Sequence, residues 1–90
     1  MKIITKKSYP DLFEKVLAGE KTFDMRVADF DIQPGDILEQ IEVNYDGTPT
    51  GRKIRHVVGE VLRTKEVDLW KQEDIDQYGY QVMSLAERVD

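Results

Sequence analysis

The 90-residue chain contains no cysteine and only one histidine, His56, and this absence excludes several kinds of site. Without cysteine there is no disulfide framework, no thiolate metal site and no cysteine nucleophile. A metal ion bound by His56 would need carboxylate partners, and the acidic residues show no spacing typical of such a site. We therefore predict no metal site and no cofactor, and we assign no catalytic role to His56 because no suitable partner accompanies it.

The chain also lacks a long hydrophobic run. After the first lysine, the N-terminal stretch Met1–Lys7 has only two consecutive apolar residues, which is unlike a signal peptide or a membrane span. We expect a cytoplasmic protein with no membrane partner. A chain of this length can build only one core, so we predict a single domain over residues 1–90, present as a monomer.

Positive charge is scarce, with 13 Lys and Arg against 18 Asp and Glu and a net charge of -5. This balance argues against a protein that coats nucleic acid indiscriminately. The signs are segregated, however: residues 27–50 hold six acids and no cation, whereas residues 51–65 hold five cations and one acid. An acidic protein can still present one positive face if Lys21 and Arg26 lie near the cations of the second block. The alternative is that these charge blocks only solvate the surface.

One amphipathic helix is predicted near the N-terminus. It begins at Ser8, which can cap the first turn together with Asp11, and Pro10 is tolerated there. An apolar face follows, formed by Tyr9, Phe13, Val16 and Leu17. Gly19 ends the helix because glycine adopts the left-handed conformation without steric cost.

The rest of the chain predicts short strands. Residues 2–5, 21–27, 37–43, 52–64 and 80–85 have strand-like composition or alternation, with a hairpin tip at 45–51 and a bend at Gly59. The acidic stretch 66–78 is interpreted as a loop with one helical turn at 72–77. We therefore predict an α+β domain, a small, partly open mixed β-barrel of five or six strands with one N-terminal helix.

The order of these parts resembles the ASCH group of the PUA-like superfamily, over nearly the whole chain. The resemblance rests on a helix that ends in Gly19-x-Lys21-Thr22, a strand that closes on Arg26, the Pro34–Leu38 turn, and a terminal Gly79–Leu85 strand. More narrowly, the chain is similar to small bacterial and phage-borne ASCH-like proteins of uncharacterised function. The resemblance implies a PUA-like β-barrel with a cleft for RNA or a nucleotide-like ligand.

The residues expected in this cleft are Lys21, Thr22, Asp24 and Arg26. Cations at Lys21 and Arg26 attract an anionic ligand, and Asp24 accepts a hydrogen bond from a base or ribose. The alternative is an ion pair of each cation with a neighbouring carboxylate, which would make them structural.

The resemblance also implies an enzymatic alternative, because a few small ASCH proteins are amidohydrolases acting on an acylated cytidine. Lys21 matches their catalytic lysine, but Asp24 stands where they have a threonine. In this chain the catalytic group would be Lys21, Thr22 and Asp24, with Lys21 activating Thr22 or a water molecule. Whether the protein is an enzyme stays open.

Two further regions can contact a ligand. Arg52, Lys53 and Arg55 follow a flexible tip and can bind a backbone phosphate, or they can simply solubilise a hairpin edge. Trp70 lies in acidic surroundings and can form the rim of a pocket. A third interpretation of the chain is an interaction module whose acidic segments contact a basic protein partner.

Overall fold

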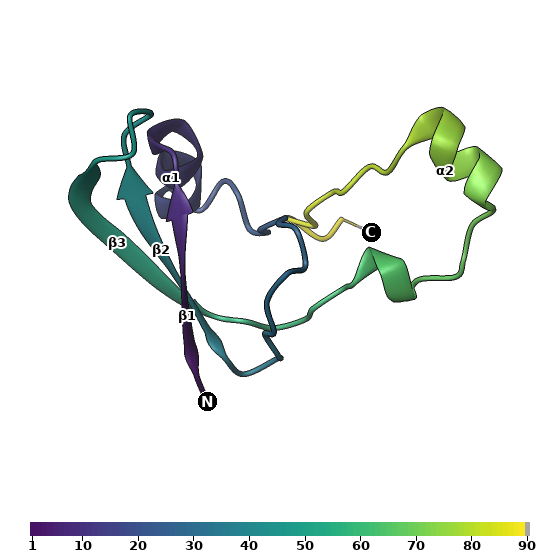
Figure 1. The fold of residues 1–90 in the computed structure, drawn as a ribbon, viewed down its shortest axis with the longest axis horizontal. Helices are drawn as coiled ribbons and strands as arrows, with labels where there is room; N and C mark the ends of the chain where they lie inside the picture. The colour runs from purple at the N-terminus through teal and green to yellow at the C-terminus, as the bar shows by residue number, and fades with distance from the viewer. Residues whose placement is uncertain (90) are drawn as a thin grey trace.

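The computed structural model describes residues 1–89. The elements in chain order are β1 (Ile3–Ser8), α1 (Pro10–Leu17), β2 (Ile37–Val43), β3 (Pro49–Val57), the single-turn 3₁₀ helix η1 (Thr64–Glu66) and α2 (Gln72–Tyr78). Figure 1 shows the three strands and α1 gathered together, while the chain after β3 runs away from the sheet, turns through α2 and comes back toward the middle.

The sheet has three strands in the order β1-β2-β3, with β2 in the centre. β1 runs parallel to β2, with Ile3 opposite Ile37 and Ser8 opposite Glu42. β3 runs antiparallel to β2, with a register irregularity between Ile41 and Val43. The sheet is open, so the predicted barrel of five or six strands is wrong, although the α+β composition holds.

The hairpin between β2 and β3 was predicted from its turn residues and is confirmed. The Asn44 amide donates to the Thr48 carbonyl at 2.8 Å, and the Gly47 amide donates to the Asn44 carbonyl at 2.8 Å. Gly47 has φ +90°, a conformation that the hairpin turn requires and that glycine adopts readily. Local turn chemistry therefore determines this pairing.

α1 is the predicted N-terminal helix, shorter at its start than expected. It begins at Pro10, with Tyr9 rather than Ser8 at the N-cap position and no side-chain cap, so the predicted capping box is absent. Phe13 and Val16 are buried against the sheet together with Val43, and these are the buried hydrophobic residues of the described chain. Gly19 ends the helix with φ +76°, as predicted.

The segment between α1 and β2 is irregular, so the predicted strand at 21–27 does not form. A strand needs a neighbouring backbone to bond with, and residues 21–27 instead contact β1 through the Arg26 side chain, which donates to the Lys7 carbonyl. Asp36 orders its last turn, since its carboxylate accepts from the amides of Gln33 at 2.9 Å and Lys2 at 3.1 Å. These bonds hold the start of β2 beside the start of β1.

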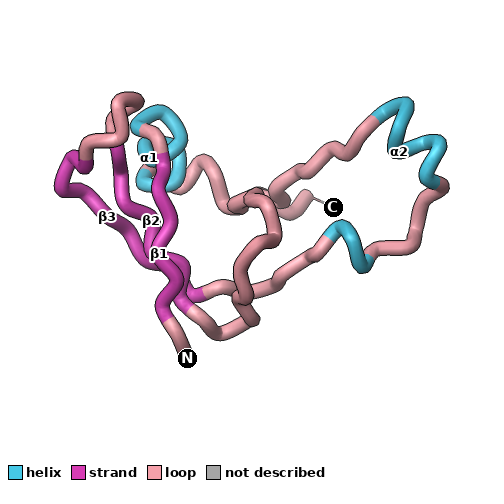
Figure 2. Tube along the Cα trace, in the orientation of Figure 1, coloured by secondary structure: helices cyan, strands magenta, loops and turns pink. Residues whose placement is uncertain are grey.

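The C-terminal third contains α2 where one helical turn was predicted, and no strand at 80–85. Figure 2 shows this part as loop, η1 and α2, without any strand to pair with the sheet. Many large apolar side chains after β3 are exposed, including Leu69, Tyr78, Met83 and Leu85. The barrel fails to close because 80–85 has no partner strand.

Candidate functional site

Three of the predicted site residues meet in one cluster. The Lys21 Nζ lies 3.9 Å from Asp24 Oδ1, and Arg26 Nε donates to Asp24 Oδ2 at 2.6 Å. Their side chains are only 16% (Lys21), 18% (Asp24) and 24% (Arg26) exposed, so the cluster is half-buried. Two cations share one carboxylate, which leaves the cluster with one positive charge in excess. We call Lys21, Asp24 and Arg26 the basic cluster.

Backbone contacts hold the basic cluster at the outer edge of β1. Arg26 Nη1 donates to the Lys7 carbonyl at 3.0 Å, and β1 has β2 on its other side. The Lys21 amide donates to the Lys15 carbonyl at the end of α1, at 3.0 Å. The cations are therefore positioned by α1 and β1, although their own segment is irregular.

Part of the Arg26 guanidinium is available to a ligand. A guanidinium carries five N–H groups. Three of its N–H donors are used, two toward Asp24 and one toward Lys7. The orientation of the guanidinium is thereby set before any ligand arrives, which reduces the entropy lost on binding.

Phe23 belongs to this site and was not predicted to do so. Phe23 is 38% exposed, and its ring centroid lies 5.3 Å from the Lys21 Nζ. A second pair of the same kind is close by on β1, where the Lys6 Nζ sits 3.8 Å above the Phe30 ring. The signal in the sequence was Phe23 two residues after Lys21, whereas the pairing of Lys6 with Phe30 depends on the fold.

Thr22 lies in the same segment but makes none of the hydrogen bonds of the basic cluster within residues 1–89. The hydrolase alternative needs the Thr22 hydroxyl, or a water in its place, to be activated by Lys21. Here Lys21 instead forms an ion pair with Asp24. A lysine paired with a carboxylate is typical of a cation that binds a ligand. A lysine acting as a base would instead contact its nucleophile, the Thr22 hydroxyl.

Arg52 is committed to acidic partners. It donates from Nε to Glu42 Oε1 at 2.9 Å and from Nη2 to Glu42 Oε2 at 2.7 Å, and it also pairs with Glu14 of α1. Thr50 Oγ1 donates to the same Glu42 carboxylate at 2.5 Å. The bidentate bond from Arg52 lowers the pKa of Glu42 to about 2, and the same bond raises the pKa of Arg52. This pairing fastens α1 to the sheet.

Arg55 of β3 is also paired with a carboxylate of the central strand β2. Its Nε donates to Glu39 Oε2 at 2.6 Å, while Thr5 Oγ1 donates to Glu39 Oε1 at 3.0 Å. The Arg55 bond is the main reason that the pKa of Glu39 is lowered. Lys53, between these two arginines, is exposed and pairs in register with Ile41.

The structure does not join these cations to the basic cluster. The basic cluster lies at the outer edge of β1, whereas Arg52, Lys53 and Arg55 lie on β3, and β2 runs between the two strands. The segregation of charge along the sequence suggested one continuous positive face. The two groups of cations are not in direct contact, so they do not form such a face together.

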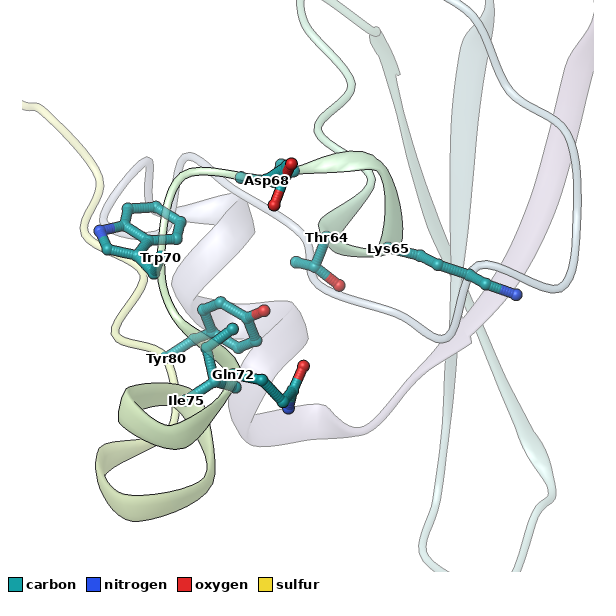
Figure 3. A pocket seen from close by; sticks show the side chains of 8 residues that line it. Thr64, Lys65, Asp68, Trp70, Gln72, Ile75 and Tyr80 are labelled. Atoms are coloured by element: carbon teal, nitrogen blue, oxygen red, sulfur yellow. The ribbon is translucent and has the colours of Figure 1, made fainter.

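Trp70 lines a separate pocket. The pocket has a volume of about 440 Å³ and is formed by η1, the start of α2 and Tyr80. The Trp70 and Tyr80 rings meet edge to face with centroids 6.2 Å apart. Figure 3 shows Thr64, Asp68 and Gln72 around the space beside the Tyr80 ring. Nothing in the sequence spacing indicated that Asp68 and Gln72 would join Trp70 there.

Two kinds of feature are absent from the described part of the chain. Residues 1–89 contain no group of three or more histidine or acidic side chains placed to hold a metal ion. None of the helices within the same residues has the length and apolar character needed to cross a membrane.

Comparison with known proteins gives one match. Neither the curated proteins nor the solved structures include a significant match to this chain. The family model described as "Domain of unknown function (DUF3850)" matches residues 5–85, which include most of β1, all of α1, the basic cluster and the Trp70 pocket. The chain therefore belongs to the DUF3850 family.

Proposed function

We propose that this protein binds RNA or a nucleotide-like ligand at the basic cluster. The observation that carries the proposal is that Lys21 and Arg26 converge on Asp24 beside the exposed ring of Phe23. Cations beside an aromatic ring suit a nucleic acid, because the cations attract phosphates and the ring stacks on a base. The resemblance of the Gly19-x-Lys21-Thr22 element to the ASCH group supports the same proposal, and we propose that relationship as well.

Each member of the site has a separate role in this proposal. Arg26 presents a guanidinium oriented by Asp24 and Lys7 to a phosphate oxygen. Lys21 adds a second positive charge, and Phe23 stacks on an adjacent base. Binding is favoured over amide hydrolysis because the Lys21 ammonium faces Asp24, while Thr22 contributes no bond to the cluster among the described residues.

The cations of β3 take no part in the proposed site. Arg52 and Arg55 are engaged by Glu42 and Glu39, and a phosphate would have to displace these carboxylates. Lys53 has the same charge and an exposed position on β3, so it serves as the matched control for Lys21.

The test is fluorescence anisotropy of a labelled, short single-stranded RNA of mixed sequence, titrated with protein at several salt concentrations. Lys21→Gln is expected to weaken binding and to reduce the slope of log affinity against log salt by about one. Phe23→Leu is expected to weaken binding about fivefold or more with an unchanged salt slope, because it removes stacking and no charge.

Lys53→Gln is expected to bind as the wild type does. Equal losses in Lys21→Gln and Lys53→Gln would indicate attraction to positive charge in general and would refute a defined site. Binding that survives Lys21→Gln unchanged would also refute the proposal. Circular dichroism of each variant establishes that the fold is retained.

A further inference from the structure

The Trp70 pocket has features that the basic cluster lacks, and its chemistry differs. Its walls include Trp70 and Tyr80, residues that are 56% and 48% exposed. Its volume of about 440 Å³ lies within the range of pockets that hold small ligands or single side chains. Large aromatic rings left open to solvent around a cavity are typical of a binding surface.

The pocket lining carries several groups that can accept a hydrogen bond. Asp68 supplies a carboxylate, and Thr64 and Tyr80 supply hydroxyl groups. The Gln72 amide nitrogen donates to Asp76 Oδ1 at 2.8 Å, which leaves the amide oxygen of Gln72 as its acceptor. A ligand rich in N–H donors complements this set.

The electrostatic surroundings of the pocket are negative. Residues 66–78 contain five carboxylates and one lysine, a net charge of −4. Lys65 also lines the pocket, but in Figure 3 its side chain extends away from the Trp70 and Tyr80 rings. A phosphate would be repelled by these carboxylates, whereas a cationic group would be attracted by them.

From these observations we propose that the pocket binds an arginine side chain of a basic protein partner. A guanidinium is planar, stacks on aromatic faces, and carries its donors in a fork that matches a carboxylate. In this arrangement it lies against Trp70, donates to Asp68 in bidentate fashion and reaches the Gln72 oxygen. A lysine ammonium offers neither the stacking plane nor the fork, so arginine is preferred.

Trp70 makes the proposal directly measurable because it is the sole tryptophan of the chain. Its emission is followed while the intact protein is titrated with a short, end-capped peptide whose one charged side chain is a central arginine. The matched peptide contains citrulline, which has the same shape without the charge. Saturable change with the arginine peptide is expected, and binding of the citrulline peptide about tenfold weaker or more.

Variants distinguish binding in the pocket from a general attraction of the peptide to negative charge. Asp68→Asn is expected to weaken arginine-peptide binding about tenfold or more, whereas Asp29→Asn, the same change at an exposed residue outside the pocket, is expected to have no effect. Tyr80→Leu tests the aromatic wall while Trp70 remains as reporter. Lys21→Gln should leave the peptide affinity unchanged, so this proposal can fail or hold independently of RNA binding.

Three results would overturn the inference. The first is equal binding of the arginine and citrulline peptides. The second is no change in Trp70 emission with either peptide at millimolar concentration. The third is saturable binding of guanosine in place of the arginine peptide, which would identify the pocket as a nucleobase site.

Discussion

Two buried carboxylates on β2 form ion pairs with the arginines of β3. Glu42 is 3% exposed and Glu39 8% exposed, and each must be compensated because a charge removed from water is costly. Arg52 and Arg55 supply that compensation from the neighbouring strand. On sequence grounds these arginines could bind a phosphate or solubilise the hairpin edge, and in the structure both are paired with carboxylates. In contrast, Lys21 and Arg26 outnumber their shared carboxylate, so the basic cluster keeps a net positive charge.

The pairing of Glu42 predicts a loss of stability in acid. The pKa of Glu42 is lowered from 4.5 to about 2 in the folded protein, first through its bond with Arg52. A lowered pKa means that the stabilisation is complete above pH 4.5 and is lost as the pH falls toward 2. The urea midpoint of unfolding, measured by circular dichroism, is expected to fall over this interval.

Glu42→Gln is expected to lower the urea midpoint at pH 7, because Arg52 loses its ionised partner on β2, and to flatten the decline in acid. Glu20→Gln removes an exposed carboxylate of the same length and controls for the change in net charge. A decline in Glu42→Gln as steep as that of the wild type would show that other carboxylates govern the acid response.

At the scale of elements, α1 and the β2–β3 hairpin are determined by local chemistry. α1 starts at a proline, buries Phe13 and Val16 on one face, and ends at Gly19. The hairpin turns at Gly47. The segments 21–27 and 80–85 have strand composition as well, but they lack a partner strand and stay irregular. Element identity here depends on whether the required hydrogen bonds can form nearby.

The end of α1 gives a prediction about one backbone angle. Gly19 has φ +76°, and no atom lies within 4 Å of the position that an alanine methyl group would take, so Gly19→Ala introduces conformational strain without a clash. We expect it to lower the free energy of unfolding by about 1 kcal/mol, measured by urea denaturation at pH 7.

Gly59 is the matched control. It also has open space around it but does not have a positive φ. Gly59→Ala should leave stability unchanged or raise it by up to about 1 kcal/mol, because alanine restricts the unfolded chain. Similar losses in both variants would show that the backbone angle of Gly19 is not the cause.

The molecule as a whole is more extended than its length requires. Its Cα radius of gyration is 15.2 Å, whereas a compact 90-residue domain has about 12 Å. Figure 1 shows the reason, since the chain from the end of β3 through α2 forms a wide excursion from the sheet. The sheet and α1 make a small core, and the Trp70 pocket lies in the excursion.

This arrangement predicts unequal protection of backbone amides. β2 is bonded on both sides and should exchange its amide hydrogens most slowly. Residues 80–85 have no sheet pairing in the structure and should exchange far faster, as followed by two-dimensional NMR in heavy water. Protection of 80–85 equal to that of β2 would mean that this segment pairs with the sheet in solution.

The sequence by itself determined the features whose hydrogen bonds join residues only a few positions apart. The α1 helix, its stop at Gly19, the β2–β3 hairpin and the exclusion of thiol chemistry all follow from residue types and short spacings. These features need no distant partner, because a helix bonds to its own next turn and a tight turn to its own flanks.

Only the tertiary structure decided the closure of the sheet and the roles of the charged residues. Barrel closure requires the end of the chain to find a free strand edge, which alternation at 80–85 cannot guarantee. The partners of Arg52, Arg55 and Trp70 depend on which strand or helix lies beside each of them. Arg52 meets Glu42 across ten residues of sequence, and Trp70 meets Tyr80 around α2. Side-chain chemistry could be read from the sequence, but which side chains meet is a property of the fold.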